Sequence, residues 1–216
     1  MESDLHKLLN RPGFKEVWHL WLSAHSGGSL PRRENLGMRP FTPYLENMLL
    51  YQWDCAGLLR CRVMGSNVQE RVQFGPKDVN WIDRVCPDVV PASKTWWNGL
   101  YDKSCAGAME YSLVYGNGDR RMGLALFMPV LSQQTEIQVL SFQEASPVYR
   151  LSSPTNKFVI GDEFLRTVYI EVSPQNVVTM GPITEHKRTE QAPACFSEVE
   201  TTISKRGATE QAFQPF

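Results

Sequence analysis

The chain has 216 residues, 42% of them hydrophobic, with a net charge of −1 and a pI near 6.4. This size and apolar content allow one domain with extensions, folded around its own core without a metal or disulfide staple. The near-zero charge gives no general attraction to nucleic acids or anionic lipids, which argues against dedicated nucleic-acid binding.

Hydropathy and cysteine usage indicate a cytoplasmic protein. The longest apolar run, Leu124 to Leu131, is interrupted by Pro129. It is far shorter than the roughly 20 residues that a membrane span requires. The first residues lack the basic and apolar character of a signal peptide. The five cysteines form no Cys-x-x-Cys pair and no zinc spacing, as expected in a reducing compartment.

The first predicted element is an amphipathic helix from about residue 11 to residue 25. Residues at helical spacing form its apolar face, namely Phe14, Val17, Trp18, Trp21 and Leu22. Ser26-Gly27-Gly28 ends the helix. Such a face covers the sheet of its own domain or forms half of a dimer, and the sequence leaves both open. The candidate interface residues are Phe14, Trp18, Trp21 and Leu22.

Two strands are predicted next, with a turn at Ala56-Gly57 between them. The first strand alternates at Leu49, Tyr51 and Trp53, and the second at Leu59, Cys61 and Val63. This alternation predicts a strand pair with one apolar face. After Gly65, short helical segments are expected at residues 67–75 and 79–85. A longer helix is expected from Ser93 to Lys103, with Ser93 as its N-cap.

Three alternating strands follow, from Met109 to Tyr115, from Met122 to Met128 and from Ile137 to Phe142. Residues 116–119, Gly-Asn-Gly-Asp, predict a hairpin turn. They lack the spacing, the following helix and the Lys-Ser/Thr pair of a phosphate-binding loop. The order strand, strand, helices, strand, strand, strand predicts an antiparallel α+β sheet with helices on one face.

The segment Arg62-Val63-Met64-Gly65-Ser66, a strand ending on glycine before a short helix, resembles the first half of a PAS domain. With Leu30-Pro31-Arg32-Arg33 upstream and the three later strands, residues 14 to 143 resemble a bacterial family of small, stand-alone PAS-like domains. That family opens with a helix and a Leu-Pro-x-Arg segment. The resemblance implies a five-stranded antiparallel sheet with short helices on one face, and a role in sensing or partner binding.

Three regions follow from these elements. Residues 1–40 hold the leading helix and the Leu-Pro-x-Arg segment, residues 41–144 the PAS-like core, and residues 145–216 a C-terminal extension. A short strand pair is possible within the extension, at Phe158–Ile160 and Val168–Ile170, split around Gly161-Asp162. Beyond about Pro174 the composition is typical of a weakly ordered tail.

The sequence identifies no cofactor, but it can be compared with the residue requirements of two cofactors, flavin and haem. In flavin photosensors of the LOV type, a Gly-x-Asn-Cys run supplies the thiol that attacks the flavin. Here Gly65-Ser66-Asn67-Val68 places a valine at that position, so a covalent flavin adduct is excluded there. Haem requires an axial ligand, and no histidine lies between His25 and His186, which argues against histidine-ligated haem. No metal site is predicted.

The resemblance implies a pocket between the sheet and its helices. A ligand there would be small and apolar or amphipathic, stacked on tryptophan and held by hydrogen bonds from Tyr111 or Arg62. The alternative is that the same residues simply fill the core. The candidate lining residues are Cys61, Val63, Val68, Val72, Trp81, Trp96, Trp97, Tyr111, Leu124, Leu126, Leu140 and Phe142.

The leading functional hypothesis is a non-enzymatic sensory or regulatory module. Ligand binding would shift the helix that carries Trp18 and Trp21, or the tail, and alter a homodimer or a contact with a protein partner. One alternative is a ligand-free interaction scaffold. The other is a small cone-shaped α+β isomerase or dehydratase, in which a carboxylate such as Asp54, Asp83 or Glu110 would have to converge with a histidine.

Overall fold

The computed structural model describes residues 4–25, 29–54, 57–72, 80–115, 120–145 and 159–186. Its centre is an eight-stranded antiparallel sheet in the order β2-β1-β5-β4-β3-β6-β7, with β8 paired to β6. The strands are β1 (Met48–Trp53), β2 (Leu59–Met64), β3 (Ala106–Tyr115), β4 (Arg120–Leu131), β5 (Ile137–Ala145), β6 (Val159–Val172), β7 (Val178–Met180) and β8 (Thr184–Glu185). The predicted antiparallel α+β class is confirmed.

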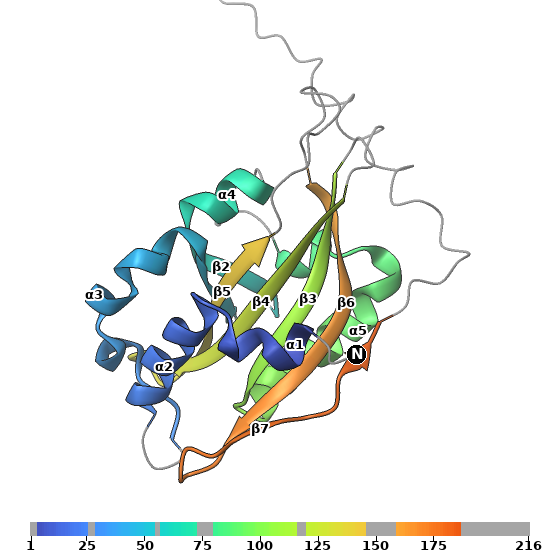
Figure 1. The fold of residues 1–216 in the computed structure, drawn as a ribbon. Coiled ribbons are helices and arrows are strands. Elements are labelled where there is room, and N and C mark those ends of the chain that lie inside the picture. Colours follow the sequence, from blue (N-terminus) through green and yellow to red (C-terminus); the bar gives the residue numbers. More distant parts are fainter. Residues whose placement is uncertain are drawn as a thin grey trace, which may run out of the picture.

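Helices cover the sheet on both faces (Figure 1), whereas the sequence predicted helices on one face. The helices before β1 are α1 (Asp4–Lys7), η1 (Leu8–Asn10), α2 (Phe14–Ala24), η2 (Arg33–Leu36), α3 (Met38–Phe41) and η3 (Thr42–Asn47). Those between β2 and β3 are α4 (Ser66–Val72), η4 (Trp81–Arg84), η5 (Pro87–Val89) and α5 (Val90–Asp102). We call the two sides of the sheet the α2 face and the α5 face. Among the described residues, no helix is both long and apolar enough to cross a bilayer.

The inner strands are apolar on both sides because each face carries its own core. In β4, Leu126 packs in the core of the α2 face, and its neighbour Phe127 packs in the core of the α5 face. In β1, Leu50 likewise packs in the core of the α2 face, and Tyr51 packs in the core of the α5 face. The expectation of one apolar face for the β1-β2 pair is therefore wrong for β1, since helical segments cover both of its sides.

The leading helix α2 is fixed to the sheet by its aromatic side chains. Phe14 meets Phe142 of β5 edge to face, with ring centroids 4.9 Å apart. The indole Nε1–H of Trp21 donates to the carbonyl oxygen of Pro129 in β4 at 2.9 Å. The pairing of β3 with β4 ends at Gly107 and Phe127, whereas β4 continues to Leu131. There the N–H of Leu131 donates to the carbonyl of Pro31 at 2.9 Å.

The C-terminal extension contributes to the same sheet, so the five strands expected become eight. The strand β6 pairs with β3 from Ala106↔Ile170 to Tyr115↔Val159 and runs through the Gly161-Asp162 segment that was expected to split it. Beyond Pro174, β7 and β8 add to β6 where a weakly ordered tail was predicted. The long partner strand β3 explains this order, because its outer edge offers a full row of backbone groups to β6.

One helix boundary differs from the prediction. The helix α5 begins at Val90, with Pro91 in its first turn, so Ser93 lies inside the helix and is fully buried instead of capping it. The helix α4 ends at Val72 within the described residues. The predicted hairpin turn at 116–119, the helix stop at 26–28, the far end of the 67–75 segment, Ala56 and Phe158 lie outside the described residues.

Gly65 lies where β2 turns into α4, directly against the backbone of η3. Its N–H donates to the carbonyl oxygen of Met48 at 2.8 Å. A Cβ at this position would lie 2.2 Å from the carbonyl oxygen of Leu45 and 2.5 Å from that of Glu46. Only glycine fits here, because both obstructing atoms belong to backbone that cannot move aside.

We therefore expect Gly65→Ala to lower the free energy of unfolding by about 3 kcal/mol or more, through overpacking at this crossing. The matched control is Gly181→Ala, where the nearest atom to the added Cβ lies 3.5 Å away. This control should remain within about 0.5 kcal/mol of the wild type. Urea denaturation of the three proteins measures both values, and equal stability of the two variants would contradict the crossing as described.

Candidate functional site

The predicted pocket residues divide between the two faces of the sheet. Those on the α5 face are Cys61, Val68, Val72, Trp81, Trp96, Trp97 and Tyr111. Those on the α2 face are Leu124, Leu126, Leu140 and Phe142. The division follows from strand geometry, since alternate residues of β4 and β5 point to opposite sides. The sheet therefore separates residues that were expected to line a single pocket.

A bulge in β2 explains the position of Val63. Leu50 of β1 pairs with Val63, but the next residue, Tyr51, pairs with Cys61, so Arg62 is an extra residue in the ladder. Cys61 is consequently buried on the α5 face, whereas Val63 is 56% exposed. Arg62 is exposed as well and donates to Gln52 Oε1 at 3.2 Å, so it is not the polar point of an interior pocket.

Aromatic side chains almost completely fill the space between the sheet and α5. The ring of Trp97 lies 5.0 Å from that of Tyr51, 5.2 Å from that of Phe127 and 5.3 Å from that of Trp96, all edge to face. The cavity that remains has a volume of about 20 Å³. It has room for about one water molecule. On this face, the packing matches the filled-core alternative.

Gln143 of β5 organises a small polar network beside this cavity. The hydroxyl of Tyr111 donates to Gln143 Oε1 at 3.3 Å, and Gln143 Nε2 donates to the hydroxyl of Tyr51 at 3.3 Å. Arg71 of α4 donates to the backbone carbonyl of Gln143 at 3.5 Å. Tyr111 was expected as a polar point, but Gln143, Tyr51 and Arg71 were missed. The available signal was a glutamine at a position where the alternation of β5 predicts burial.

A large apolar hollow lies on the other side, against the strands β1 and β2. It is a groove of about 730 Å³ between these strands and the segment η2-α3-η3. Its apolar lining includes Leu36, Phe41, Met48, Leu50, Val130 and Leu140. Met38, Leu45 and Val63 also line it and are 55%, 37% and 56% exposed. Val63 and Leu140 are the predicted pocket residues that it contains.

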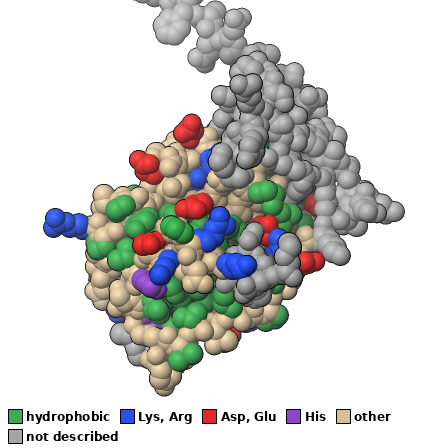
Figure 2. Space-filling view, in the orientation of Figure 1, with side chains coloured by type: hydrophobic (Ala, Val, Ile, Leu, Met, Phe, Trp, Pro, Cys, Tyr) green, Lys and Arg blue, Asp and Glu red, His purple; other side chains and the backbone are tan. Residues whose placement is uncertain are grey.

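The charged residues that line the groove are Arg33, Glu34 and Glu46. Arg33 of η2 donates to Gln138 Oε1 at 3.1 Å, and Glu46 of η3 accepts from Asn67 Nδ2 at 3.3 Å. Figure 2 shows hydrophobic side chains on one face of the molecule, with positive and negative side chains interspersed instead of gathered by sign. A ligand in the groove would therefore be held chiefly by apolar contact, with polar groups at its rim.

The predicted interface residues of α2 are used within the chain. Phe14, Trp18 and Trp21 are at most 3% exposed, and Leu22 is partly buried against the same core. The rings of Trp18 and Trp21 contact each other at a tilt of 32°, with centroids 5.0 Å apart. These side chains cover the sheet of their own domain, so in this conformation they offer no surface to a second protein.

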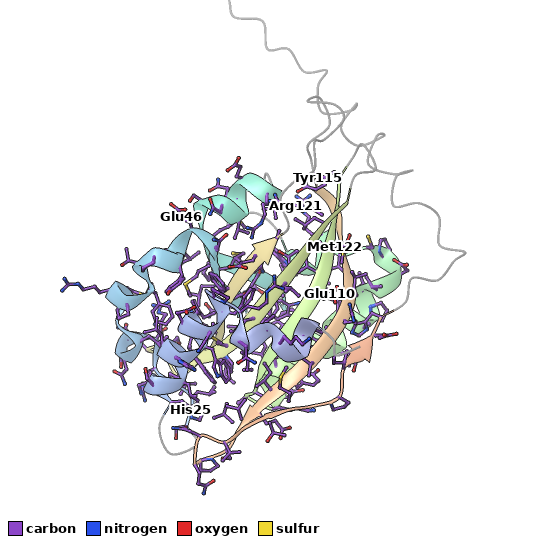
Figure 3. All side chains as sticks on the ribbon, in the orientation of Figure 1. His25, Glu46, Glu110, Tyr115, Arg121 and Met122 are labelled. Carbon is purple, nitrogen blue, oxygen red and sulfur yellow. The ribbon has the colours of Figure 1, made fainter. Side chains whose placement is uncertain are left out.

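The carboxylates that an enzyme would need are engaged elsewhere. Asp54 pairs with Arg60 at 3.0 Å, Asp83 accepts from Asn80 at 2.9 Å, and Glu110 pairs with Arg166 at 2.6 Å. Figure 3 shows His25 at the end of α2, far from Glu110 on β3. Burial lowers the pKa of His25 and of His186. Within the described ranges, no three His, Cys, Asp or Glu side chains group closely enough to hold a metal ion.

A search of protein-family models gives no match to the chain, and a search of curated proteins gives none either.

The cysteines among the described residues have the buried surroundings that are typical of structural cysteines. Cys61, Cys86 and Cys105 are free thiols and are buried. Burial raises the pKa of Cys61 to about 12 and that of Cys105 to about 11. At pH 8 the thiolate fraction of Cys61 is then on the order of 1 in 10,000, and the thiolate is the reactive form. Cys55 and Cys195 lie outside the described residues.

We expect Cys61 and Cys105 to resist alkylation by iodoacetamide at pH 8 in the folded protein. After unfolding in guanidinium chloride, both should react at the rate of ordinary cysteines. Peptide mass spectrometry after timed labelling measures the two rates, with the unfolded sample as the control. Fast modification of Cys61 under native conditions would mean that the core of the α5 face is open to reagents.

Proposed function

We propose that this chain is a non-enzymatic, PAS-like regulatory module of the cytoplasm that binds a small apolar or amphipathic molecule in the groove between β1-β2 and η2-α3-η3. Occupancy of the groove is signalled to a protein partner or a second copy of the chain. The observation that carries the proposal is the groove itself. Its volume of about 730 Å³ falls within the range of roughly 300–1,000 Å³ that is usual for small-molecule sites.

The order of elements supports the PAS-like part of the proposal. The chain runs β1, β2, then α4, η4, η5 and α5, then β3, β4 and β5. This is the order that the sequence resemblance implies, with the inserted helices packed on one side of the sheet. The helices before β1 and the strands after β5 are additions around this arrangement.

The location of the groove supports a regulatory role. One wall is built from Arg33 to Glu46, a run of short helices that follows α2 in the chain. The opposite wall includes Leu50 of β1 and Val63 of β2. A ligand that contacts both walls would favour the wall spacing that it binds more tightly. The size of the shift is set by the difference in binding free energy between the two spacings.

A ligand-free interaction scaffold is the second candidate. The packing of the α5 face favours it, because the cavity among its described residues, about 20 Å³ in volume, is too small for a metabolite. In that case the exposed side chains Met38, Leu45 and Val63 would belong to a contact surface for another protein. The enzyme alternative lacks comparable support, since Asp54, Asp83 and Glu110 are held in separate pairs.

The test compares two exposed valines. Val63→Glu places a charge in the groove, whereas Val177→Glu places one at an equally exposed position outside it, with exposures of 56% and 60%. Titration with the fluorescent apolar anion 8-anilinonaphthalene-1-sulfonate should give saturable binding to the wild type and to Val177→Glu. Binding to Val63→Glu should be at least tenfold weaker, a loss of about 1.4 kcal/mol or more.

Native mass spectrometry of the protein purified from its host provides the second measurement. A small molecule retained by the wild type and by Val177→Glu, but lost from Val63→Glu, supports the proposal. An empty protein that forms a stable dimer would instead favour the interaction scaffold. Equal probe binding by both variants would place the ligand outside the groove and overturn the proposal.

A further inference from the structure

Methionine is concentrated in the groove between β1-β2 and η2-α3-η3. Three of the eight methionines of the chain, Met38, Met48 and Met64, line it. A thioether is apolar and flexible, so it suits a surface that adapts to an apolar ligand. Unlike the leucine and valine side chains beside it, a thioether is also a target of mild oxidants. The groove therefore contains side chains whose polarity can be changed after folding.

Met38 is the groove methionine that solvent reaches most easily. It is the first residue of α3, a helix of four residues in one wall of the groove, and it is 55% exposed. Met48 is 3% exposed, and Met64 is partly buried against the core of the α5 face. An oxidant must contact the sulfur atom in order to react with it, so a dissolved oxidant reacts with Met38 before Met48.

Oxidation of Met38 by hydrogen peroxide is a balanced two-electron step. A lone pair of the sulfur atom attacks one peroxide oxygen, the O–O bond breaks, and the S–O bond of the sulfoxide forms. The hydroxide that leaves takes the proton of the transferred hydroxyl group and becomes water. Sulfur is oxidised and the peroxide is reduced. Methionine sulfoxide reductases reverse the change, so the modification is not permanent.

A sulfoxide at position 38 changes what the groove can bind. Its oxygen is polar, whereas the neighbouring lining residues Leu36 and Phe41 are apolar and almost completely buried. An apolar ligand that covers the sulfoxide removes its oxygen from water without supplying a hydrogen bond, which opposes binding. The fold itself loses little, because the exposed side chain of Met38 contributes little to the core.

We propose that Met38 is an oxidation site through which peroxide controls the groove. With a thioether at position 38 the groove holds its apolar or amphipathic ligand, and with a sulfoxide it releases that ligand. This inference rests on the proposed ligand site in the groove, and it adds the chemical signal that regulates that site.

Peptide mass spectrometry after timed treatment of the full chain with hydrogen peroxide shows which methionines react. Met38 and Met122, which are 55% and 41% exposed, should be oxidised roughly tenfold faster or more than Met48, Met109 and Met128, which are at most 3% exposed. Oxidation of Met38 at the slow rate of the buried methionines would overturn the proposal.

Titration with 8-anilinonaphthalene-1-sulfonate then measures the affinity of the groove before and after a treatment that oxidises only the exposed methionines. The wild type should bind roughly fivefold more weakly after treatment, and methionine sulfoxide reductases of both epimer specificities should restore its affinity. The matched control is Met122→Leu, which removes an exposed methionine outside the groove and should respond like the wild type. Met38→Leu should keep the affinity that it had before treatment, whatever that value is.

Two results would overturn the control by Met38 and leave the ligand site intact. One is an unchanged affinity of wild-type protein in which Met38 is fully oxidised, and the other is an equal loss of affinity in Met38→Leu. Equal probe binding by Val63→Glu and the untreated wild type would be a different result, because it would place the ligand outside the groove and overturn the site and its regulation together.

Discussion

Burial of the sheet on both faces is the constraint on which the rest of this structure depends. Neighbouring residues such as Leu126 and Phe127 in β4 are both almost completely removed from solvent, on opposite sides. Burying a large apolar side chain stabilises a fold by about 1.5–3 kcal/mol, so neither face can be left uncovered. The α5 face is covered by the segment between β2 and β3, and the α2 face by the segment before β1.

This division also determines where the molecule has space. On the α5 face, Trp96, Trp97 and Phe127 interlock at ring distances of 4.8 to 5.3 Å and leave a cavity of only about 20 Å³. On the α2 face, the cover over β1 and β2 consists of the short helices η2, α3 and η3. Short helices cover a sheet less completely than one long helix does, and the groove lies beneath them.

The local alternation of residues was enough to predict most strands and the leading helix. The apolar face of α2 and the strands from Met109 to Phe142 follow directly from their periods. The strand β6 was underestimated, because polar residues and Gly161 interrupt its pattern and its stability comes from pairing with β3. Pairing between distant segments does not appear in a local pattern.

The candidate site was harder to predict, for two physical reasons. Alternation shows that residues share a side of one strand, but it does not tell which sides of different strands share a core. Leu140 and Phe142 were therefore grouped with Trp97, from which the sheet separates them. The extra residue Arg62 in β2 then moved Val63 away from the face of Cys61. A bulge of this kind has no sequence signature without glycine.

The contact between the leading segment and β4 has a consequence for how the protein behaves in a crowded solution. Where β4 continues past β3, its main chain is paired with the indole of Trp21 and the carbonyl of Pro31. Unpaired strand backbone is a template on which another chain can add a strand, and such addition leads to aggregation. The segment around α2 thus covers this stretch of β4 against strand addition, in addition to closing the core of the α2 face.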